Sequence, residues 1–547
     1  MTQDQIQSSA PAERYLLGID VGTGSARAGV FTLDGRMQAA GKSPISLHRE
    51  GGGIAEQSSR EIWQAVCTAV RTAVAGAGID PGNVAGIGFD ATCSLVVLGP
   101  GGAPLPVGSP DAPQRDIIVW MDHRAIAQAE RINATGHSVL QYVGGTISPE
   151  METPKLLWLK ENRPEVFGAA WQFFDLTDFL TWRATGDLAR SACTVTCKWT
   201  YLAHERRWDA SYFHQIGLGC LADGEFARIG QRVVDPGTPL GSGLTEAAAE
   251  ELGLEPGTPV AAGLIDAHAG GLGTAGADGA PEDSLGYVFG TSSCTMTSTR
   301  EPVFVPGVWG PYYSAMIPGL WLNEGGQSAA GAAIDQLLSF HPAAAQAETA
   351  ARAQGLTLPE HLSRLAGQKA GSPSAVVELA RGMHVVPEFL GNRAPHADPY
   401  ARAVIAGLGM ERERDSLVAL YAAGLCGIGY GLRQIIEAQD RAGAPVSRIA
   451  ISGGAGQSGL VRQLLADATG KPVYASAAAE PVLLGSAILG CLAAGIVPGA
   501  GAAMAAMSRT SQCYRPAGGA IRQAHESRYK TFQALQDAAR HVRACSG

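Results

Sequence analysis

The sequence predicts an α/β protein made of two halves, and three observations support this prediction. At 547 residues, the chain exceeds the length at which a single hydrophobic core usually stops growing. Strand-like runs alternate with segments of helical period in both halves. A Gly-Thr-x-Ser turn between two β-prone runs occurs twice, within LLGIDVGTGSARAGV (16–30) and GYVFGTSSCTMT (286–297).

Composition narrows the classes of function. The chain has a net charge of −9, and its basic residues are scattered rather than gathered in one run. This argues against nucleic acid or a membrane as a partner. The polar residues 1–12 predict a disordered tail. The uncharged segment 481–508 is long enough to span a bilayer, but Pro498 and several glycines favour a buried helix at 482–494 followed by an Ala-rich helix.

Ten cysteines lie far apart along the chain, which predicts reduced thiols and a cytoplasmic location rather than disulfides. Cys193 and Cys197 form the closest pair, and their four-residue spacing could hold a metal ion. No second Cys/His pair follows at a usable distance, so we predict thiols in the core or in a loop.

Local patterns place the elements and the domain boundary. The Gly/Ala-rich stretch 270–283 predicts a crossing between an N-terminal domain (13–275) and a C-terminal domain (276–547). Strands are expected within 14–35, 84–89, 95–98, 260–264, 285–299 and 448–452, and helices at 60–78, near 328–340 and 411–438, after 458 and over 520–543.

The two Gly-Thr-x-Ser turns suit phosphate oxygens, because they offer closely spaced backbone N–H groups and hydroxyls. A single turn of this kind is usually no more than a turn. Two of them, each opening one half, predict facing loops that hold a polyphosphate. The residues concerned are Gly22, Thr23, Gly24, Ser25 and Arg27 in the first hairpin, and Gly290, Thr291 and Ser292 in the second.

An aspartate precedes only the first of these turns. Asp20 stands where a carboxylate could reach Mg²⁺ bound to the phosphates, whereas the matching position before the second turn is Val288. One metal ion needs one such anchor, so the second hairpin needs only donors. The chain has no GxxxxGK[ST] loop and is therefore not a P-loop protein.

These residues carry a resemblance to the FGGY family of carbohydrate kinases, within the sugar kinase/Hsp70/actin superfamily. The resemblance covers roughly residues 14–500 and follows the family's order. Besides the hairpins, its pieces are IIVWMDHRA (117–125), TPKLLWLKENRPEVF (153–167), FFDLTDFLTWRATGD (173–187), GLIDAHAGGLGT (263–274), EFLGNRAPHADPYARAVIAGL (388–408), ISGGAGQSGLVRQLLADATGKPV (451–473) and AAEPVLLGSAILG (478–490).

The resemblance implies two actin-like (ribonuclease H-like) domains with the active site in the cleft between them, and ATP and Mg²⁺ as cofactors. In ISGGAGQS, Gly453 and Gly454 would lie against the adenosine, with Ala455 and Gln457 at the edge of base and ribose. Read without the resemblance, the same residues are a common strand-to-helix turn.

Asp266 follows the apolar run VAAGLI, where α/β folds usually present groups to a ligand. By resemblance it is the general base that takes the proton of the sugar hydroxyl, and it also reaches Mg²⁺. The alternative is an aspartate that caps the following helix. His268 either lines the cleft or packs beneath it.

The resemblance places the sugar beside Asp266. The motif FDATCSLV (89–96) resembles the signature of D-ribulose kinases and contributes Asp90 and Thr92. The other expected sugar-binding residues are Trp120, Lys198 and Glu324. Lys198 could instead be a solvated surface charge, Glu324 an acid at a helix start, and Asp122 and Arg124 of the WxDxR segment a structural pair.

D-ribulose, phosphorylated to D-ribulose 5-phosphate, is the acceptor that the resemblance favours. Ribitol, L-ribulose and other pentitols or ketopentoses stay open as alternatives. A nucleotide-dependent chaperone or actin-like scaffold is the alternative outside enzymes, although it would not require the set Asp90, Lys198 and Glu324. The expected partners are the sugar and ATP, and a homodimer stays open.

Overall fold

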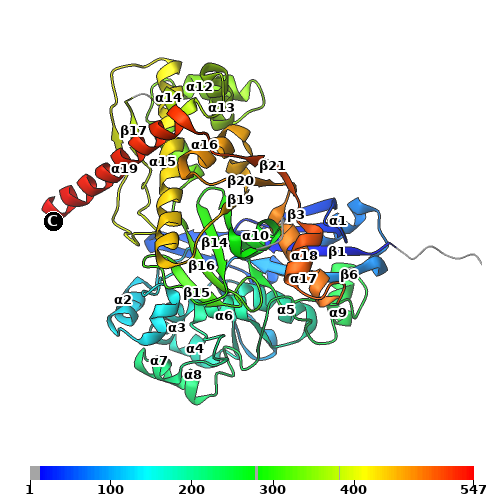
Figure 1. The fold of residues 1–547 in the computed structure, drawn as a ribbon. Helices are drawn as coiled ribbons and strands as arrows, with labels where there is room; N and C mark the ends of the chain where they lie inside the picture. Colours follow the sequence, from blue (N-terminus) through cyan, green and yellow to red (C-terminus); the bar gives the residue numbers. More distant parts are fainter. Residues whose placement is uncertain (1–12, 277–280, 381, 547) are drawn as a thin grey trace, which may run out of the picture.

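The structure is a computed structural model that describes residues 13–276, 281–380 and 382–546 (Figure 1). The tail predicted for residues 1–12 lies outside the described residues, as does part of the predicted crossing at 270–283. Within that crossing the chain is helical up to Ala275, the last residue of α10 (Asp266–Ala275).

The first half is built on a five-stranded sheet with the order β12-β6-β1-β2-β3. β1 runs antiparallel to β2 and parallel to β6, which runs parallel to β12. The strands are β1 (Tyr15–Val21), β2 (Ser25–Thr32), β3 (Met37–Pro44), β6 (Val84–Ala91) and β12 (Leu264–Ile265).

The second half is built on a seven-stranded sheet with the order β15-β16-β14-β13-β19-β20-β21. β13 runs antiparallel to β14 and parallel to β19, so the middle of this sheet repeats the arrangement around β1. The strands are β13 (Ser284–Phe289), β14 (Ser293–Thr299), β15 (Trp309–Tyr313), β16 (Trp321–Gln327), β19 (Arg448–Ser452), β20 (Val473–Ser476) and β21 (Thr510–Tyr514).

The repeated arrangement confirms the predicted fold class, an α/β protein with two actin-like halves. The strand predicted at 260–264 is wrong in extent, since β12 comprises only Leu264 and Ile265. Val260 forms only an isolated parallel bridge with Ile87 of β6, and the residues around it also bond to a loop, where Leu240 N–H donates to Val260 O (2.9 Å) and Ala262 N–H donates to Thr238 O (2.8 Å).

A third sheet with the order β4-β5-β8-β7-β9, the two-stranded sheet β10-β11 and a group of short helices complete the first half, and α2, α3, α7 and α8 lie at the lower left of Figure 1. Their bounds are β4 (His48–Glu50), β5 (Ile54–Gln57), β7 (Leu95–Leu98), β8 (Ile117–Ile118), β9 (Gln172–Asp175), β10 (Arg190–Ser191), β11 (Val233–Val234), α2 (Ile126–Ala134), α3 (Glu152–Asn162), α4 (Pro164–Ala169), α5 (Leu176–Thr185), α6 (Ala192–Trp199), α7 (Ala210–Gln215), α8 (Gly219–Asp223) and α9 (Glu246–Leu252).

The remaining elements surround the second sheet. α15 is long and apolar enough to cross a membrane by length and composition (mean hydropathy 1.3), but 89% of that window is buried, as in the core helix of a globular half. The elements are α11 (Gly331–Ser339), α12 (Ala344–Arg352), α13 (Leu358–Ala370), α14 (Val376–Leu379), β17 (His384–Val386), β18 (Val404–Ala406), α15 (Arg414–Ala442), α16 (Gly459–Thr469) and α19 (Gly519–Ser546).

Both faces of the first sheet are covered, which explains the almost unbroken apolar sequence of β1. α1 (Ser59–Ala77) packs against β2 and β3. Its ends are set by Ser58, whose side chain accepts a bond from Glu61 N–H, and by Gly78 in the left-handed conformation. α17 (Pro481–Ala493), which continues through a loop to α18 (Ala500–Met507), packs against β1 and β6 although in sequence it lies between β20 and β21 of the second sheet.

Glycines let the backbone of α17 approach this sheet. A Cβ added at Gly18 would lie 2.0 Å from Leu483 O, and one at Gly88 would lie 1.9 Å from Ser486 O. Leu483 and Ser486 are three residues apart and therefore share one helix face. The helix predicted at 482–494 is thus a buried helix of the fold, and the domain boundary predicted at residue 275 is crossed in space by α17.

We expect Gly88→Ala to lower the free energy of unfolding by about 2 kcal/mol or more, because the added methyl group meets a backbone carbonyl that cannot rotate away. Chemical denaturation measures this change. The control is Gly168→Ala in α4, where an added Cβ meets nothing within 4 Å. A loss at Gly88 no larger than that at Gly168 would contradict the packing argument.

Candidate functional site

Three carboxylates meet at the carboxyl ends of three adjacent strands. Asp20 on β1 and Asp90 on β6 are register partners, and Asp266 follows β12 directly. Because these strands run parallel, their carboxyl ends lie at the same edge of the sheet. The structure therefore brings together the predicted metal and catalytic residues.

This cluster is electrostatically strained. Burial, followed by the charge of Asp20, raises the pKa of Asp266 to about 6. The same two causes raise the pKa of Asp90 well above its usual range. Asp90 Oδ1 is buried without a hydrogen-bond partner, while Asp90 Oδ2 accepts a bond from Ser486 of α17. A cluster of carboxylates with an unsatisfied buried oxygen suits a hard divalent cation.

The first hairpin is tied to its surroundings through side chains. Arg27 Nε donates to Asp20 Oδ2 (2.7 Å), and Arg27 Nη1 pairs with Glu480 (2.7 Å), the residue before α17. Trp120 Nε1 donates to Thr23 Oγ1 (3.0 Å), and Gln57 Nε2 donates to Thr23 O (2.8 Å). The predicted phosphate turn thus contacts the predicted wall of the sugar site.

The second hairpin borders a cavity of about 700 Å³ that also reaches the GGAGQS segment. Gly290 and Thr291 line one side, and Gly454 and Gln457 line another. Gly453 has φ of +92°, and a Cβ there would lie 2.5 Å from Phe289 O, so only glycine suits this position. The described residues of the two predicted ATP segments therefore share one hollow; the side chain of Ala455 lies outside the description.

Lys198 and Glu324 are both buried and lie near each other. Lys198, at the end of α6, is 4% exposed, and Glu324, on β16, is 5% exposed. The alternative readings of a surface lysine and a helix-start acid are therefore wrong. Among the described residues, no hydrogen bond or ion pair reaches Lys198 Nζ, which lies 5.0 Å from the ring centre of Trp309.

Two residues of this region were missed in the sequence. Trp309 is the register partner of Glu324, and the guanidinium of Arg393 lies 5.5 Å from the Trp309 ring centre. Arg393 stands within the segment 388–408 that carried the resemblance, but its sequence context assigns it no partner. No sequence pattern pointed to Trp309, because only strand register brings it beside Glu324.

His268 and Cys193 lie beneath the same region. Cys193 Sγ is 3.1 Å from His268 Nδ1, and His268 Nε2 is 3.2 Å from Glu324 Oε2. Burial opposes the charged forms, but the charges of Lys198 and His268 and a hydrogen bond from His268 lower the pKa of Glu324 to about 2. His268 is thus packed beneath the cleft, and Cys193 and Cys197 are core thiols whose spatial neighbour is a distant histidine.

Comparisons with known proteins agree with this arrangement. The profile of the FGGY family of carbohydrate kinases, N-terminal domain, matches residues 15–273, and that of the C-terminal domain matches residues 285–494. The chain belongs to the FGGY family of carbohydrate kinases. It is therefore an ATP-dependent sugar kinase, and the alternative of a chaperone or scaffold is not supported.

Relatives of this FGGY kinase include a human FGGY carbohydrate kinase domain-containing protein, 45% identical over 92% of this chain and 93% of that protein. A D-ribulokinase of Saccharomyces cerevisiae is 38% identical over 89% of this chain and 73% of that protein. The solved xylulose kinase of Rhodospirillum rubrum is similar in fold, with a TM-score of 0.80 and 23% identity over 97% of this chain and 99% of that chain.

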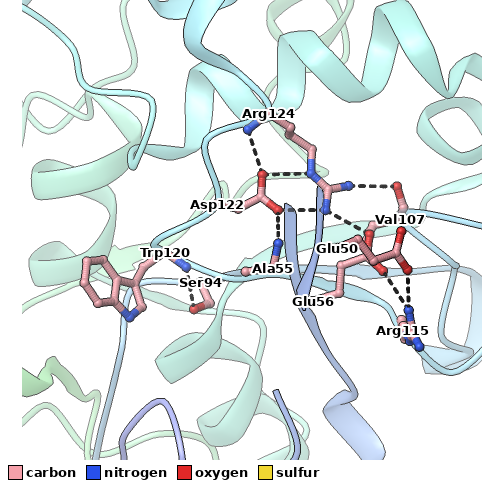
Figure 2. Close-up of polar contacts among 9 residues, drawn as sticks. All are labelled: Glu50, Ala55, Glu56, Ser94, Val107, Arg115, Trp120, Asp122 and Arg124. Atoms are coloured by element: carbon pink, nitrogen blue, oxygen red, sulfur yellow. Dashed lines mark hydrogen bonds and ion pairs between the residues drawn. The ribbon is translucent and has the colours of Figure 1, made fainter. Parts of the chain in front are cut away.

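The WxDxR segment of this FGGY kinase divides into two roles (Figure 2). Asp122 and Arg124 point toward each other and toward Glu56, with Arg124 Nη2 2.7 Å from Asp122 Oδ2 and 2.8 Å from Glu56 Oε1. Asp122 Oδ2 also accepts a bond from Ala55 N–H (2.7 Å). Trp120 lies apart from this group, so Asp122 and Arg124 form a structural pair.

Asp90 and Thr92, predicted to bind the sugar, are buried. Asp90 has no exposed surface and belongs to the carboxylate cluster, so direct contact with a sugar would require a rearrangement. Thr92 is 5% exposed, and its hydroxyl lies 3.3 Å from Ser94 Oγ. Ser94 Oγ in turn accepts a bond from Trp120 N–H (3.1 Å), so these residues support the tryptophan.

We expect Arg124→Ala to lower the free energy of unfolding by about 3–5 kcal/mol, because it leaves the buried Asp122 carboxylate without its counter-ion and Glu56 with only Arg115, at 3.9 Å, among the described residues. Denaturant unfolding measures this change. The matched control, Arg131→Ala, removes an exposed partner of Glu161 and should cost less than about 1 kcal/mol. Equal effects of the two substitutions would contradict the structural assignment of Arg124.

Proposed function

We propose that this FGGY kinase transfers the γ-phosphoryl group of ATP to D-ribulose and forms D-ribulose 5-phosphate in the cytoplasm. The observation that carries the choice of a polyhydroxy acceptor is the buried pair Lys198 and Glu324. A buried ammonium without a partner beside a buried carboxylate is costly unless a polar ligand completes it. The relative named as a D-ribulokinase supports the choice of ketose.

In the proposed reaction, the acceptor hydroxyl oxygen bonds to the γ-phosphorus, the bond from that phosphorus to the bridging oxygen of ADP breaks, and Asp266 takes the hydroxyl proton. Gly22, Thr23, Gly24, Ser25, Gly290, Thr291 and Ser292 hold the phosphates. Gly453, Gly454, Ala455 and Gln457 hold the adenosine. Lys198, Glu324 and Trp120 orient the sugar, with Asp90 and Thr92 behind them.

Asp20 and Asp266 would hold Mg²⁺, and the strained carboxylate cluster suits that ion. When bound, Mg²⁺ supplies positive charge to the phosphates during transfer. Arg27 bonds to both Asp20 and Glu480, so it balances the charge of Asp20 and is placed to meet a phosphate oxygen.

A panel of acceptors tests the choice of substrate. Purified protein with ATP and Mg²⁺ is expected to show its highest kcat/KM with D-ribulose, ahead of L-ribulose, ribitol and D-xylulose. Pockets that hydrogen-bond each hydroxyl discriminate strongly against analogues that leave a buried polar group unpaired. A higher kcat/KM for any other member of the panel would refute D-ribulose and leave the sugar kinase assignment in place.

Two substitutions should separate chemistry from binding. Asp266→Asn is expected to lower kcat about 10³-fold with little change in the KM for ATP, because the amide cannot accept the proton.

Lys198→Met is expected to raise the KM for the sugar roughly tenfold and to leave the KM for ATP unchanged. Steady-state kinetics measure both. A Lys198 variant that weakens ATP binding instead would move Lys198 out of the sugar site.

A further inference from the structure

Three buried polar side chains from different elements form a continuous chain under the proposed sugar site. Cys193 lies on α6, His268 on α10 and Glu324 on β16. Sγ of Cys193 is 3.1 Å from Nδ1 of His268, and Nε2 of His268 is 3.2 Å from Glu324 Oε2. Cys193 and His268 have no exposed surface. This series of hydrogen bonds therefore links the first half of the protein to a strand of the second sheet.

The protons of this chain have a defined order. A carboxylate only accepts hydrogen bonds, so Nε2 of His268 must carry the proton shared with Glu324. Nδ1 then either accepts a hydrogen bond from the Cys193 thiol or donates one to its thiolate. In both states Nε2 carries a proton and donates a hydrogen bond to Glu324. The imidazole ring is thus held at both nitrogens, and it orients one oxygen of the carboxylate.

Cys193 also reaches the backbone beside Asp266. Ile265 N–H donates to Cys193 Sγ (3.3 Å), and Ile265 directly precedes Asp266. His268, the other partner of the sulfur, stands two residues after Asp266. The sulfur therefore contacts the chain on both sides of the proposed base.

We propose that Cys193 and His268 are positioning residues that hold Glu324 in the orientation needed to bind the acceptor sugar. This inference rests on the proposed role of Glu324 in the sugar site. Lys198 attracts the same carboxylate, since its charge contributes to the low pKa of Glu324. Without the Nε2 donor, the Glu324 carboxylate would be free to turn toward Lys198 and away from the sugar.

The same residues could be read as a metal site. The ligand atoms of Cys193, Cys197 and His268 lie within 4.8 Å of one another. However, the sulfur of Cys193 already accepts a backbone N–H, and the outer imidazole nitrogen is directed at Glu324. The contacts are those of a hydrogen-bonded chain, and stoichiometric zinc in the purified protein would overturn our proposal.

Two substitutions of His268 separate the two ring nitrogens. Glutamine places its amide nitrogen near the position of Nε2, whereas asparagine places it near Nδ1. We expect His268→Asn to raise the acceptor KM roughly tenfold or more, because a hydrogen bond to a charged group is lost. His268→Gln should stay within about threefold of wild type, and the KM for ATP should change less than about twofold in both variants.

Cys193 is tested in the same way. Cys193→Ala should raise the acceptor KM at least about threefold, and Cys193→Ser should restore it, since a hydroxyl can replace the thiol as a partner of Nδ1. The control for a merely structural role is His525→Gln, whose amide would lie near Nε2 and away from the bonded Nδ1. His525 is also a buried histidine, but it bonds to Tyr430 between α15 and α19 (3.0 Å). This control should lower the melting temperature and leave the acceptor KM unchanged.

The kinetic experiment uses D-ribulose, or whichever member of the panel wild type phosphorylates best. Failure of the D-ribulose assignment is thus visible with wild-type protein alone and leaves this test intact. If His268→Asn and His268→Gln have the same acceptor KM, or if His268→Asn changes only the melting temperature as His525→Gln does, the positioning role is refuted.

Discussion

The contact between α17 and the first sheet is the constraint on which the rest of the site depends. Bare backbone at Gly18 and Gly88 lets the helix approach closely. At that distance Ser486 bonds to Asp90, and Glu480, just before the helix, bonds to Arg27. A helix encoded between two strands of the second sheet therefore organises the carboxylates and the hairpin of the first half.

This contact also explains how three neighbouring carboxylates are tolerated in the folded protein. Arg27 neutralises Asp20 on the side of the hairpin, and the hydroxyl of Ser486 satisfies one oxygen of Asp90. The remaining oxygen of Asp90 has no partner, and burial with a neighbouring charge raises the pKa of Asp266. The surrounding residues hold the cluster together. Among the described side chains, none bonds to the second oxygen of Asp90, so the cluster can still bind a cation.

Much of the fold was accessible from sequence because its signals are local. β19 (Arg448–Ser452) and β7 (Leu95–Leu98) have their predicted bounds, since each is a short apolar run bordered by glycine or serine. The two hairpins were visible because Gly-Thr turns punctuate such runs. The extent of β12 was not, because Val260 makes only an isolated bridge to β6 and Val260 and Ala262 also bond to a loop that no periodicity reveals.

Residues of the site could be predicted only under two conditions. A motif had to contain the residue, and its neighbours in space had to follow from the order of the strands. Asp20 and Asp266 meet because parallel strands end together. The link from Cys193 to His268 joins residues 75 positions apart, and its existence depends on how α6 packs against α10. Asp90 was assigned to the sugar from its motif, and strand register shows what the motif could not, that it lies beside Asp20 and is fully buried.

The two hairpins share one backbone conformation but differ in the residue that precedes the turn. Both turns contain three residues between their strands, 22–24 and 290–292, and both border a parallel neighbour. The position two residues before the turn is Asp20 in the first copy and Val288 in the second. Val288 packs toward α10, where a Cβ at Gly270 would lie 3.2 Å from its methyl group. A carboxylate at this second position would be buried against the helix that starts at Asp266, adding another like charge close to the cluster. The asymmetry therefore agrees with the packing: α10 packs against β13, and the equivalent position that faces it is apolar.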